Sequence, residues 1–509
     1  MGLRKRFTIN LLATWSNHVL GMLLALILMP KVLGTLGDST YGTWVFISAI
    51  AGYFGLLNLG LGQTISRYVA THHAKGEADQ VNRVVNVIGA VYVAMSGLAI
   101  SMAGVIAWLV PILWPNCGVS VWELRWVIVI LGVNVAVSIS GSVFGGVLIG
   151  RQRFDLERAF VFLSGLVRFG LTLLLLQKQS GLLILAVIFL ATTLAENLGY
   201  MLCVLRLVPE LRLGFRFLNR QTFRECCSFS AFAMLEAGSA MLIESTDCVV
   251  IGCVLGINAI VPYCVAQRLC QYISKPLQAI ASVCLPRAGE LHAQGNTAEL
   301  RALMARAVGL AWLLVMSFFI GASFFGPTLM ATWVQKTYPH TQTILLVLLA
   351  GQLVGTPMRV VTSVLFGMGE VRRPSLIYVI EAIANFTLSL SLISGLGLVG
   401  VALGTVIPLY VVELGLLLPF AMKRLEFAPR RLLTDVAGPQ LAPLVALWSY
   451  SYLVWSHVPL HPGWPRIIAI AVGGALVLGA TWLAQQQLCR WWNDSKWNTG
   501  RWSVAEPHA

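Results

Sequence analysis

The sequence contains very little charge for its length. Only 11% of its 509 residues are Asp, Glu, Lys or Arg, against about 25% in an average soluble domain. Hydrophobic residues make up 57% of the chain, and the mean hydropathy is +0.79. So few charged side chains cannot cover a water-facing surface. The composition therefore excludes a soluble globular protein and predicts an all-α, polytopic membrane protein.

The sequence also lacks the motifs of enzymes and of metal or redox sites. It has no HExxH, GxSxG, P-loop or aspartate-cluster motif, and no stretch between apolar runs is long enough for a catalytic domain. There is no CxxC pair, and the ten Cys lie mostly within apolar runs, as small core residues do. We therefore expect no enzyme activity, no disulfide framework, and no bound metal or cofactor.

Apolar runs of about 20 residues, the length needed to cross a bilayer, are found fourteen times. They cover residues 8–30, 41–63, 84–110, 126–149, 158–176, 181–207, 226–255, 260–285, 303–326, 342–367, 375–394, 397–421, 436–457 and 466–488. The first run is longer than the apolar core of a signal peptide, about 7–15 residues, so it predicts an uncleaved first helix.

Lys and Arg are distributed unevenly between the two sets of loops. If the N-terminus is inside, 26 of the 35 lie on the cytoplasmic side, 5 lie outside and 4 lie within spans. This asymmetry follows the positive-inside rule and predicts an even number of spans with both termini in the cytoplasm. The basic residues form no arm interleaved with aromatic side chains, so nucleic acid is not an expected partner.

The sequence repeats itself at a period near 220 residues. Three pairs carry the repeat, at offsets of 220, 222 and 217: Arg67 with Arg287, Tyr41 with Tyr263, and Gly150 with Gly367. Each half would hold six spans, an even number, so both halves have one orientation and an axis along the membrane normal relates them. We predict six-helix lobes at residues 1–210 and 211–421, with substrate between them. Residues 422–509 add two helices and a Trp-rich cytoplasmic tail.

Ionisable side chains are concentrated in the seventh and eighth spans. The seventh carries Glu236, Glu244 and Asp247, and the eighth carries Arg268 and Lys275. Glu236 and Asp247 are about three helical turns apart and share a face, as do Arg268 and Lys275 at about two turns. Charge at membrane depth must be paired or face water. Two interpretations stay open: the lining of a polar cavity, or structural salt bridges such as Asp247 with Arg268.

Other polar residues within spans are further candidates. Arg359, Arg168 and Arg67 are basic, and for Arg168 and Arg67 the alternative is a side chain that snorkels to the inner surface. The acidic candidates, which would pair with cations or carry protons, are Glu381, Glu413 and Glu196. His18 would titrate near neutral pH or serve as a hydrogen-bonded core residue. The LGLG motif at residues 59–62 is expected to lie in a helix and permit close packing.

Two stretches resemble a known family. They are Pro30-KVLGTLGDSTYGTW, with the YFGLLNLGLGQTISRYVA that ends at Ala70, and Asp247-CVVIGCVLGINAIVPYCVAQRL. Both resemble the bacterial lipid-linked oligosaccharide flippases, the Wzx-type polysaccharide exporters of the multidrug/oligosaccharidyl-lipid/polysaccharide exporter superfamily. The resemblance covers roughly residues 10–420. Pro262 departs from the family, which more often has Gly at that position.

The resemblance implies a function and a set of partners. The cargo would be a polyprenyl-pyrophosphate-linked glycan, moved across the bacterial inner membrane by alternating access for polysaccharide or lipopolysaccharide O-antigen synthesis. Membrane lipid, a polysaccharide polymerase and glycosyltransferases would be partners. The predicted substrate-binding residues are Arg268, Lys275, Arg359, Arg168 and Arg67, because such cations donate strong hydrogen bonds to pyrophosphate. The predicted coupling or ion-pair residues are Asp247, Glu236, Glu244 and Glu381.

Two alternative functions remain compatible with the sequence. One is a cation-coupled extruder of drugs or metabolites from the same superfamily. Such a protein would favour a cavity rich in carboxylates and aromatic residues, whereas this chain carries both signs of charge within its spans. The other is a scaffold that has lost transport. The glycan, the coupling ion and the oligomeric state do not follow from the sequence.

Overall fold

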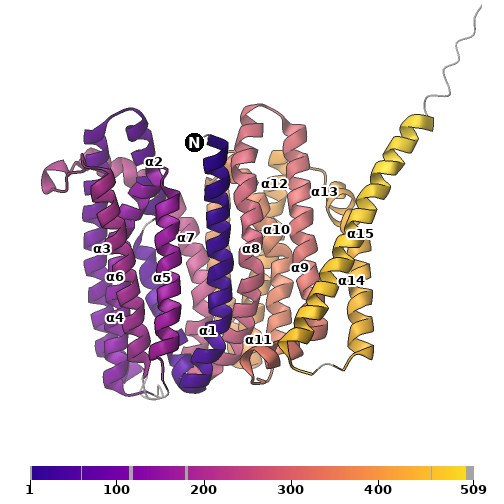
Figure 1. The fold of residues 1–509 in the computed structure, drawn as a ribbon, viewed down its shortest axis with the longest axis horizontal. Coiled ribbons are helices and arrows are strands. Elements are labelled where there is room, and N and C mark those ends of the chain that lie inside the picture. The colour runs from indigo at the N-terminus through magenta and orange to yellow at the C-terminus, as the bar shows by residue number, and fades with distance from the viewer. Residues whose placement is uncertain (1–2, 59, 114–118, 178–180, 460, 500–509) are drawn as a thin grey trace, which may run out of the picture. The chain divides into compact units, whose positions relative to one another are not determined.

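The computed structural model describes the backbone of residues 3–58, 60–113, 119–177, 181–459 and 461–499. The side chains of His18, Glu236 and Lys275 lie outside the described part. Within the described residues every regular element is a helix, as Figure 1 shows. This confirms the predicted all-α, polytopic fold class.

Eight helical elements precede the predicted lobe boundary or follow it directly. They are α1 (Leu3–Phe54), η1 (Gly55–Asn58), α2 (Leu61–Ala74), α3 (Ala78–Leu113), α4 (Val121–Gly150), α5 (Phe154–Leu175), α6 (Gly181–Leu207) and η2 (Phe215–Phe217). Helices α3, α4 and α6 pack on one another in that order, and α5 packs on α6 (Figure 1).

The remaining elements begin with the long seventh helix. They are α7 (Arg220–Val254), η3 (Ile257–Ala259), α8 (Ile260–Ala293), α9 (Thr297–Val334), α10 (Thr341–Gly367), α11 (Arg372–Val412), η4 (Glu413–Leu417), α12 (Leu418–Leu425), α13 (Pro429–Arg431), η5 (Leu432–Ala437), α14 (Gly438–His457) and α15 (Trp464–Thr499). Of these, η4 and η5 are π-helical.

All the predicted spans fall on helices in the described part of the chain. Among the described residues, nine helical segments are long and apolar enough to cross a membrane by length and composition. One of them, Arg372–Leu425, contains two predicted spans, and Gly397 interrupts its helical backbone. Helices α7 and α8 carry the charged residues noted above, which lowers their hydropathy.

The second predicted span is not one continuous helix. After Phe54 the chain forms the short 3₁₀ helix η1, and α2 begins only after Gly60, which has φ 64°. Gly adopts this left-handed conformation without the steric cost that a side chain would bring. The expectation that the LGLG motif lies within a helix is therefore wrong, because its Gly60 starts a new one.

Backbone turns recur at nearly the same period as the sequence repeat. Three pairs of glycines with positive φ are separated by 216 to 219 residues: Gly37 (78°) with Gly256 (88°), Gly76 (74°) with Gly295 (69°), and Gly181 (62°) with Gly397 (58°). A positive φ favours glycine, so this backbone torsion recurs together with the residue type. The two halves thus share local geometry as well as residue types.

The contacts within the chain divide it into two compact units that differ from the predicted lobes. Unit 1 comprises Met1–Val265 with Val371–Pro408, and unit 2 comprises Ala266–Glu370 with Leu409–Ala509. Each unit is described by itself below. The lobe boundaries at residues 1–210, 211–421 and 422–509 stay a prediction.

In unit 1, two asparagines on α3 hold the segment that follows α6. The side-chain amide of Asn82 donates to the carbonyl of Glu210 and accepts from the backbone N–H of Arg212 at 3.0 and 2.8 Å. One turn later Asn86 donates to the carbonyl of Arg212 and accepts from Gly214 N–H at 2.7 and 2.8 Å. Residues 210–214 are therefore fastened to α3 by four hydrogen bonds.

Candidate functional site

A polar cavity lies among α4, α5 and α6 in unit 1. Its volume is about 450 Å³, and it is lined by Asn134, Ser138, Ser142, Arg168, Phe189, Thr193, Glu196, Asn197 and Tyr200. A neighbouring hollow of about 310 Å³ shares Asn134, Ser138 and Phe189 with it and extends to α1 and η1. From here on, the polar cavity means both hollows together. The volume of each falls within the range of small-molecule sites, about 300–1,000 Å³.

One wall of the polar cavity is a stripe on α4. Asn134, Ser138 and Ser142 are each four residues apart, so they lie on one helical face. The buried side-chain oxygen of Asn134 has no hydrogen-bond partner among the described residues. The sequence signal for this wall is the i, i+4, i+8 spacing of neutral polar residues within an apolar run, which carries no ionisable group.

Arg168 lies in the second half of α5 and lines the polar cavity. Its Nε donates to the hydroxyl of Thr192 at 3.0 Å, and its Nη2 donates to that of Thr193 at 3.4 Å. The guanidinium carbon is 4.4 Å from the centre of the Phe189 ring, in a cation–π contact. These contacts hold the side chain against α6, and its depth in the membrane stays a prediction.

Glu196 supplies the negative charge of the polar cavity. Its carboxylate accepts hydrogen bonds from the hydroxyl of Ser164 on α5 and from that of Tyr200, one turn away, at 2.9 Å. The Tyr200 ring packs edge-on against Phe160, with centroids 5.6 Å apart. These two hydroxyl donors fix the position of the carboxylate in the cavity wall.

Asn197 depends on a glycine in the facing helix. Its amide donates to the carbonyl of Thr193 at 2.8 Å. A Cβ atom at Gly141 on α4 would collide with the side chain of Asn197. A residue without a side chain is therefore required at position 141 for Asn197 to occupy its place in the cavity wall.

A second polar cluster in unit 1 surrounds Asp247 on α7. This residue is only 1% exposed. The hydroxyl of Tyr263 donates to its Oδ2 at 2.5 Å, and the hydroxyl of Thr405 lies 3.2 Å from both carboxylate oxygens. The sequence offered Arg268 as the partner of Asp247, and no spacing rule pointed to Thr405.

Arg268 belongs to unit 2, where its side chain is exposed and its Nη1 donates to Gln271 at 3.3 Å. The predicted pairing of Arg268 with Asp247 therefore stays a prediction. Tyr263 is one of the residues that carry the sequence repeat, and its contact with the carboxylate gives that position a physical role.

The other predicted site residues are placed individually. Arg67 on α2 and Glu244 on α7 are exposed, Arg359 on α10 is half-buried, and Glu381 on α11 is 4% exposed. Glu413 is buried where η4 begins. Glu236 lies on α7 and Lys275 on α8, with side chains outside the described part. Their roles in binding or coupling stay predictions.

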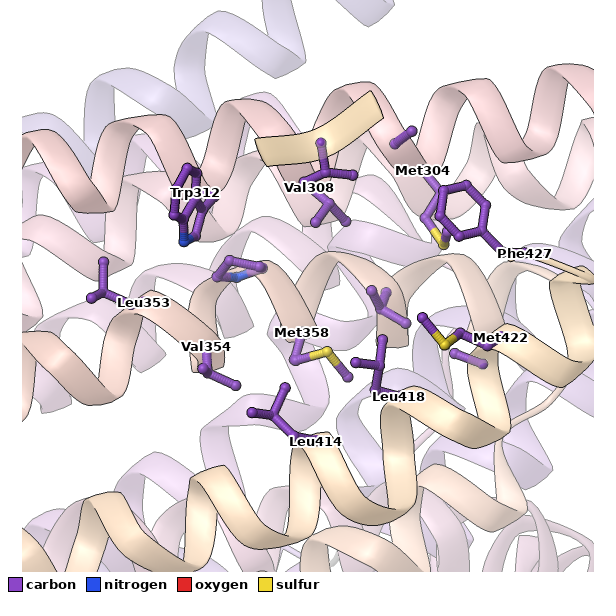
Figure 2. A pocket seen from close by; sticks show the side chains of 15 residues that line it. Met304, Val308, Trp312, Leu353, Val354, Met358, Leu414, Leu418, Met422 and Phe427 are labelled. Carbon is purple, nitrogen blue, oxygen red and sulfur yellow. The ribbon is translucent and has the colours of Figure 1, made fainter. Parts of the chain in front are cut away.

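Unit 2 contains a pocket of the opposite character. It has a volume of about 210 Å³ and lies between α9, α10, η4, α12 and η5. Figure 2 shows Met304, Met358 and Met422 around it, with Trp312 and Phe427 towards its two ends. Every residue that lines it is apolar, so it offers no group that would hold a charged or strongly polar ligand. We call it the apolar pocket.

The long apolar helices are those of a multi-span membrane protein. Residues 7–292 match the family described as "Polysaccharide biosynthesis protein". Because the match covers more than half of the chain, the chain belongs to this family, which confirms the resemblance found in the sequence.

Individual relatives are distant in sequence. The chain is 20% identical to the "Uncharacterized membrane protein EpsK" of Bacillus subtilis (strain 168), over 92% of this chain and 93% of that protein. It is similar in structure to "Lipid II flippase MurJ, inward closed conformation", with TM-score 0.70, 13% identity, and coverage of 94% and 98%. An inward-facing multidrug resistance MATE family transporter gives TM-score 0.61 and 15% identity, over 79% of this chain and 94% of that one. These structural likenesses establish the fold.

Proposed function

We propose that this chain moves a polyprenyl-pyrophosphate-linked oligosaccharide across a bacterial inner membrane by alternating access, for polysaccharide or O-antigen synthesis. Membership of the polysaccharide biosynthesis family supports a role in glycan synthesis. The observation that carries the proposal is the polar cavity, which places amide, hydroxyl and charged groups within helices long enough to span a membrane.

The physical difficulty of this reaction lies in the head of the cargo. A glycan and a pyrophosphate must cross about 30 Å of hydrocarbon, where every unsatisfied polar group is costly. A protein lowers this barrier by lining the path with groups that replace water. Asn134, Ser138 and Thr193 are groups of this kind, whereas the polyprenyl tail can stay in lipid.

The predicted site residues take roles within this proposal. Arg268, Lys275 and Arg359 bind the pyrophosphate, through charge-assisted hydrogen bonds. Arg168 contacts the cargo within the polar cavity. Asp247 is the coupling residue, since a buried carboxylate held by hydroxyl groups can exchange a proton or bind a cation in place of its donors. Arg67 guides the head at the membrane surface.

Transport can be measured with the full chain in proteoliposomes. A fluorescent polyprenyl-pyrophosphate oligosaccharide is placed in the inner leaflet, and its appearance outside is followed by quenching with an impermeant reagent. We expect quenching to exceed that of protein-free vesicles. In cells, deletion should cause lipid-linked sugars to accumulate on the cytoplasmic face.

If the chain is instead a cation-coupled extruder, the opposite results are expected for lipid-linked sugars and for drugs. Deletion would then leave lipid-linked sugars at their normal level and raise sensitivity to cationic drugs. Proteoliposomes would export such drugs along an ion gradient, and the lipid-linked substrate would remain in its original leaflet.

A further inference from the structure

We propose that the polar cavity binds an uncharged sugar residue of the cargo and that the pyrophosphate is bound elsewhere. The inference rests on the proposed function and names the part of the substrate that this site takes. It is carried by the balance of charge, the hydrogen-bonding groups and the aromatic rings that line the polar cavity.

The charges of the polar cavity cancel. Arg168 contributes one positive charge and Glu196 one negative charge, and the other lining residues of both hollows are neutral. A pyrophosphate placed here would meet the carboxylate of Glu196 as well as Arg168, and the like-charge contact disfavours an anion. A neutral ligand meets no such barrier.

The hydrogen-bonding groups of the polar cavity suit a polyhydroxyl ligand. Asn134 presents a buried carbonyl oxygen that has no partner among the described residues. On η1, Asn58 receives a hydrogen bond from the hydroxyl of Tyr92 at 2.5 Å, which fixes its amide at the edge of the hollow. Amides and hydroxyls both donate and accept, as sugar hydroxyls do, so the two sets of groups can satisfy each other.

Aromatic rings complete the recognition surface. Trp44 on α1 and Phe189 on α6 both line the smaller hollow and meet edge to face, with centroids 5.3 Å apart. Both side chains are half-buried, so part of each ring is open. The faces of a pyranose ring carry C–H groups, which pack well on aromatic surfaces. Polar walls with an aromatic side thus match a sugar better than a compact anion.

The first test measures the preference between two synthetic substrates. Polyprenyl pyrophosphate carrying N-acetylglucosamine and the same lipid carrying glucuronic acid are transported by the full chain in proteoliposomes. We expect the neutral substrate to move about tenfold faster, which corresponds to about 1.4 kcal/mol. Glu196→Gln leaves Arg168 unopposed and should reduce this ratio. Arg168→Gln leaves Glu196 unopposed and should increase it.

The double variant Arg168→Gln with Glu196→Gln sharpens the test, because it restores charge balance and should restore the ratio of the parent. Arg206→Gln is the matched control, since Arg206 is an exposed cation on α6, the helix of Glu196, and does not line the cavity. Membrane levels of all variants are measured alongside. If the single variants slow both substrates by the same factor, or if the parent prefers the acidic substrate, the inference is wrong.

A second test is independent of transport. Ser138→Cys is introduced into a variant without native cysteines, and its alkylation by an uncharged maleimide is followed in nanodiscs. N,N′-diacetylchitobiose should slow the reaction several-fold, whereas glucuronate and inorganic pyrophosphate should not. A protein that keeps only native Cys253, exposed on α7, should react at one rate throughout.

The two tests separate the inference from the proposed function. Sugar protection of the cysteine at position 138 without transport of either lipid would support the cavity's ligand and contradict the flippase. Transport without sugar protection, or protection by pyrophosphate, would overturn the cavity's ligand and leave the flippase standing.

Discussion

The polar cavity of unit 1 and the apolar pocket of unit 2 differ in chemistry although the two sequence halves share a repeat. Glu196 lines the polar cavity. An offset of 217, the spacing of Gly150 and Gly367, leads from it to Glu413, which is buried beside Leu414 of the apolar pocket. Repetition of backbone turns therefore does not imply repetition of function, and each site must be argued from its own side chains.

The comparison predicts that the apolar pocket matters for stability and the polar cavity for transport. Met358 lines the apolar pocket and is 4% exposed. Met358→Ala should lower the free energy of unfolding by about 2–5 kcal/mol, because it enlarges a void among packed side chains. Thermal unfolding of the purified protein measures this effect. In the polar cavity, Asn134→Leu should reduce the transport rate and change the free energy of unfolding less than Met358→Ala does. A larger loss of stability in Asn134→Leu, or a larger loss of transport in Met358→Ala, would contradict this division of roles.

Filling the polar cavity from its back wall should have the next largest effect. Gly141→Ala forces Asn197 to move and should cost about 1–3 kcal/mol, as overpacking does, together with much of the transport rate. Gly165→Ala is the control, since nothing lies within 4 Å of a Cβ at that position. It should be neutral or stabilising, as Ala is favoured over Gly in a helix. Equal losses in both variants would contradict a special role for position 141.

Tyr263 in unit 1 and Tyr410 in unit 2 each donate a hydrogen bond within their own unit, and the strengths of these two bonds can be compared. Tyr263→Phe removes a donor from the buried carboxylate of Asp247 and should cost about 1.5–3 kcal/mol, the range for charged partners. Tyr410→Phe in unit 2 removes a bond of 2.8 Å to the carbonyl of Ala350 and should cost about 0.5–1.5 kcal/mol. Urea or thermal unfolding gives both values. A larger loss for Tyr410→Phe would contradict the assignment of a carboxylate-centred cluster to unit 1.

If Asp247 is the coupling residue, a substitution that preserves its shape should still change transport. Asp247→Asn keeps the size of the side chain and removes its charge. Transport by this variant should lose its dependence on the proton or sodium gradient, measured as the ratio of rates with and without the gradient. An unchanged rate with an unchanged gradient dependence would show that coupling occurs elsewhere.

Single cysteine substitutions in loops of both units should have the smallest effect on the protein, and their labelling in intact cells reports the topology. Arg212→Cys in unit 1 and Arg430→Cys in unit 2 should resist an impermeant reagent, because the charge asymmetry predicts a cytoplasmic position for both loops. Lys336→Cys, in a predicted outer loop, should react. Labelling of Arg212→Cys from outside would overturn the predicted topology of the whole chain.

Hydrophobic length predicted the helices well, and the structure departs from the expected pattern where single residues act. Runs of about 20 apolar residues can only be helices in a bilayer, so the spans followed from composition. The break at Gly60 and the kink at Gly397 did not, because they depend on one backbone torsion each. The polar cavity escaped prediction for another reason: its wall is made largely of neutral Asn, Ser and Thr residues of α4 and α6, which lie far apart in the sequence.

The hydrogen bonds from Asn82 and Asn86 on α3 to residues 210–214 bear on the order in which the chain folds during synthesis. Asn82 and Asn86 emerge from the ribosome well before residues 210–214, to which they bind. Since domains generally form in the order of synthesis, the first six spans can close on this segment while α7 is still being translated. The start of α7 at Arg220 would then be positioned before the rest of unit 1 has been made.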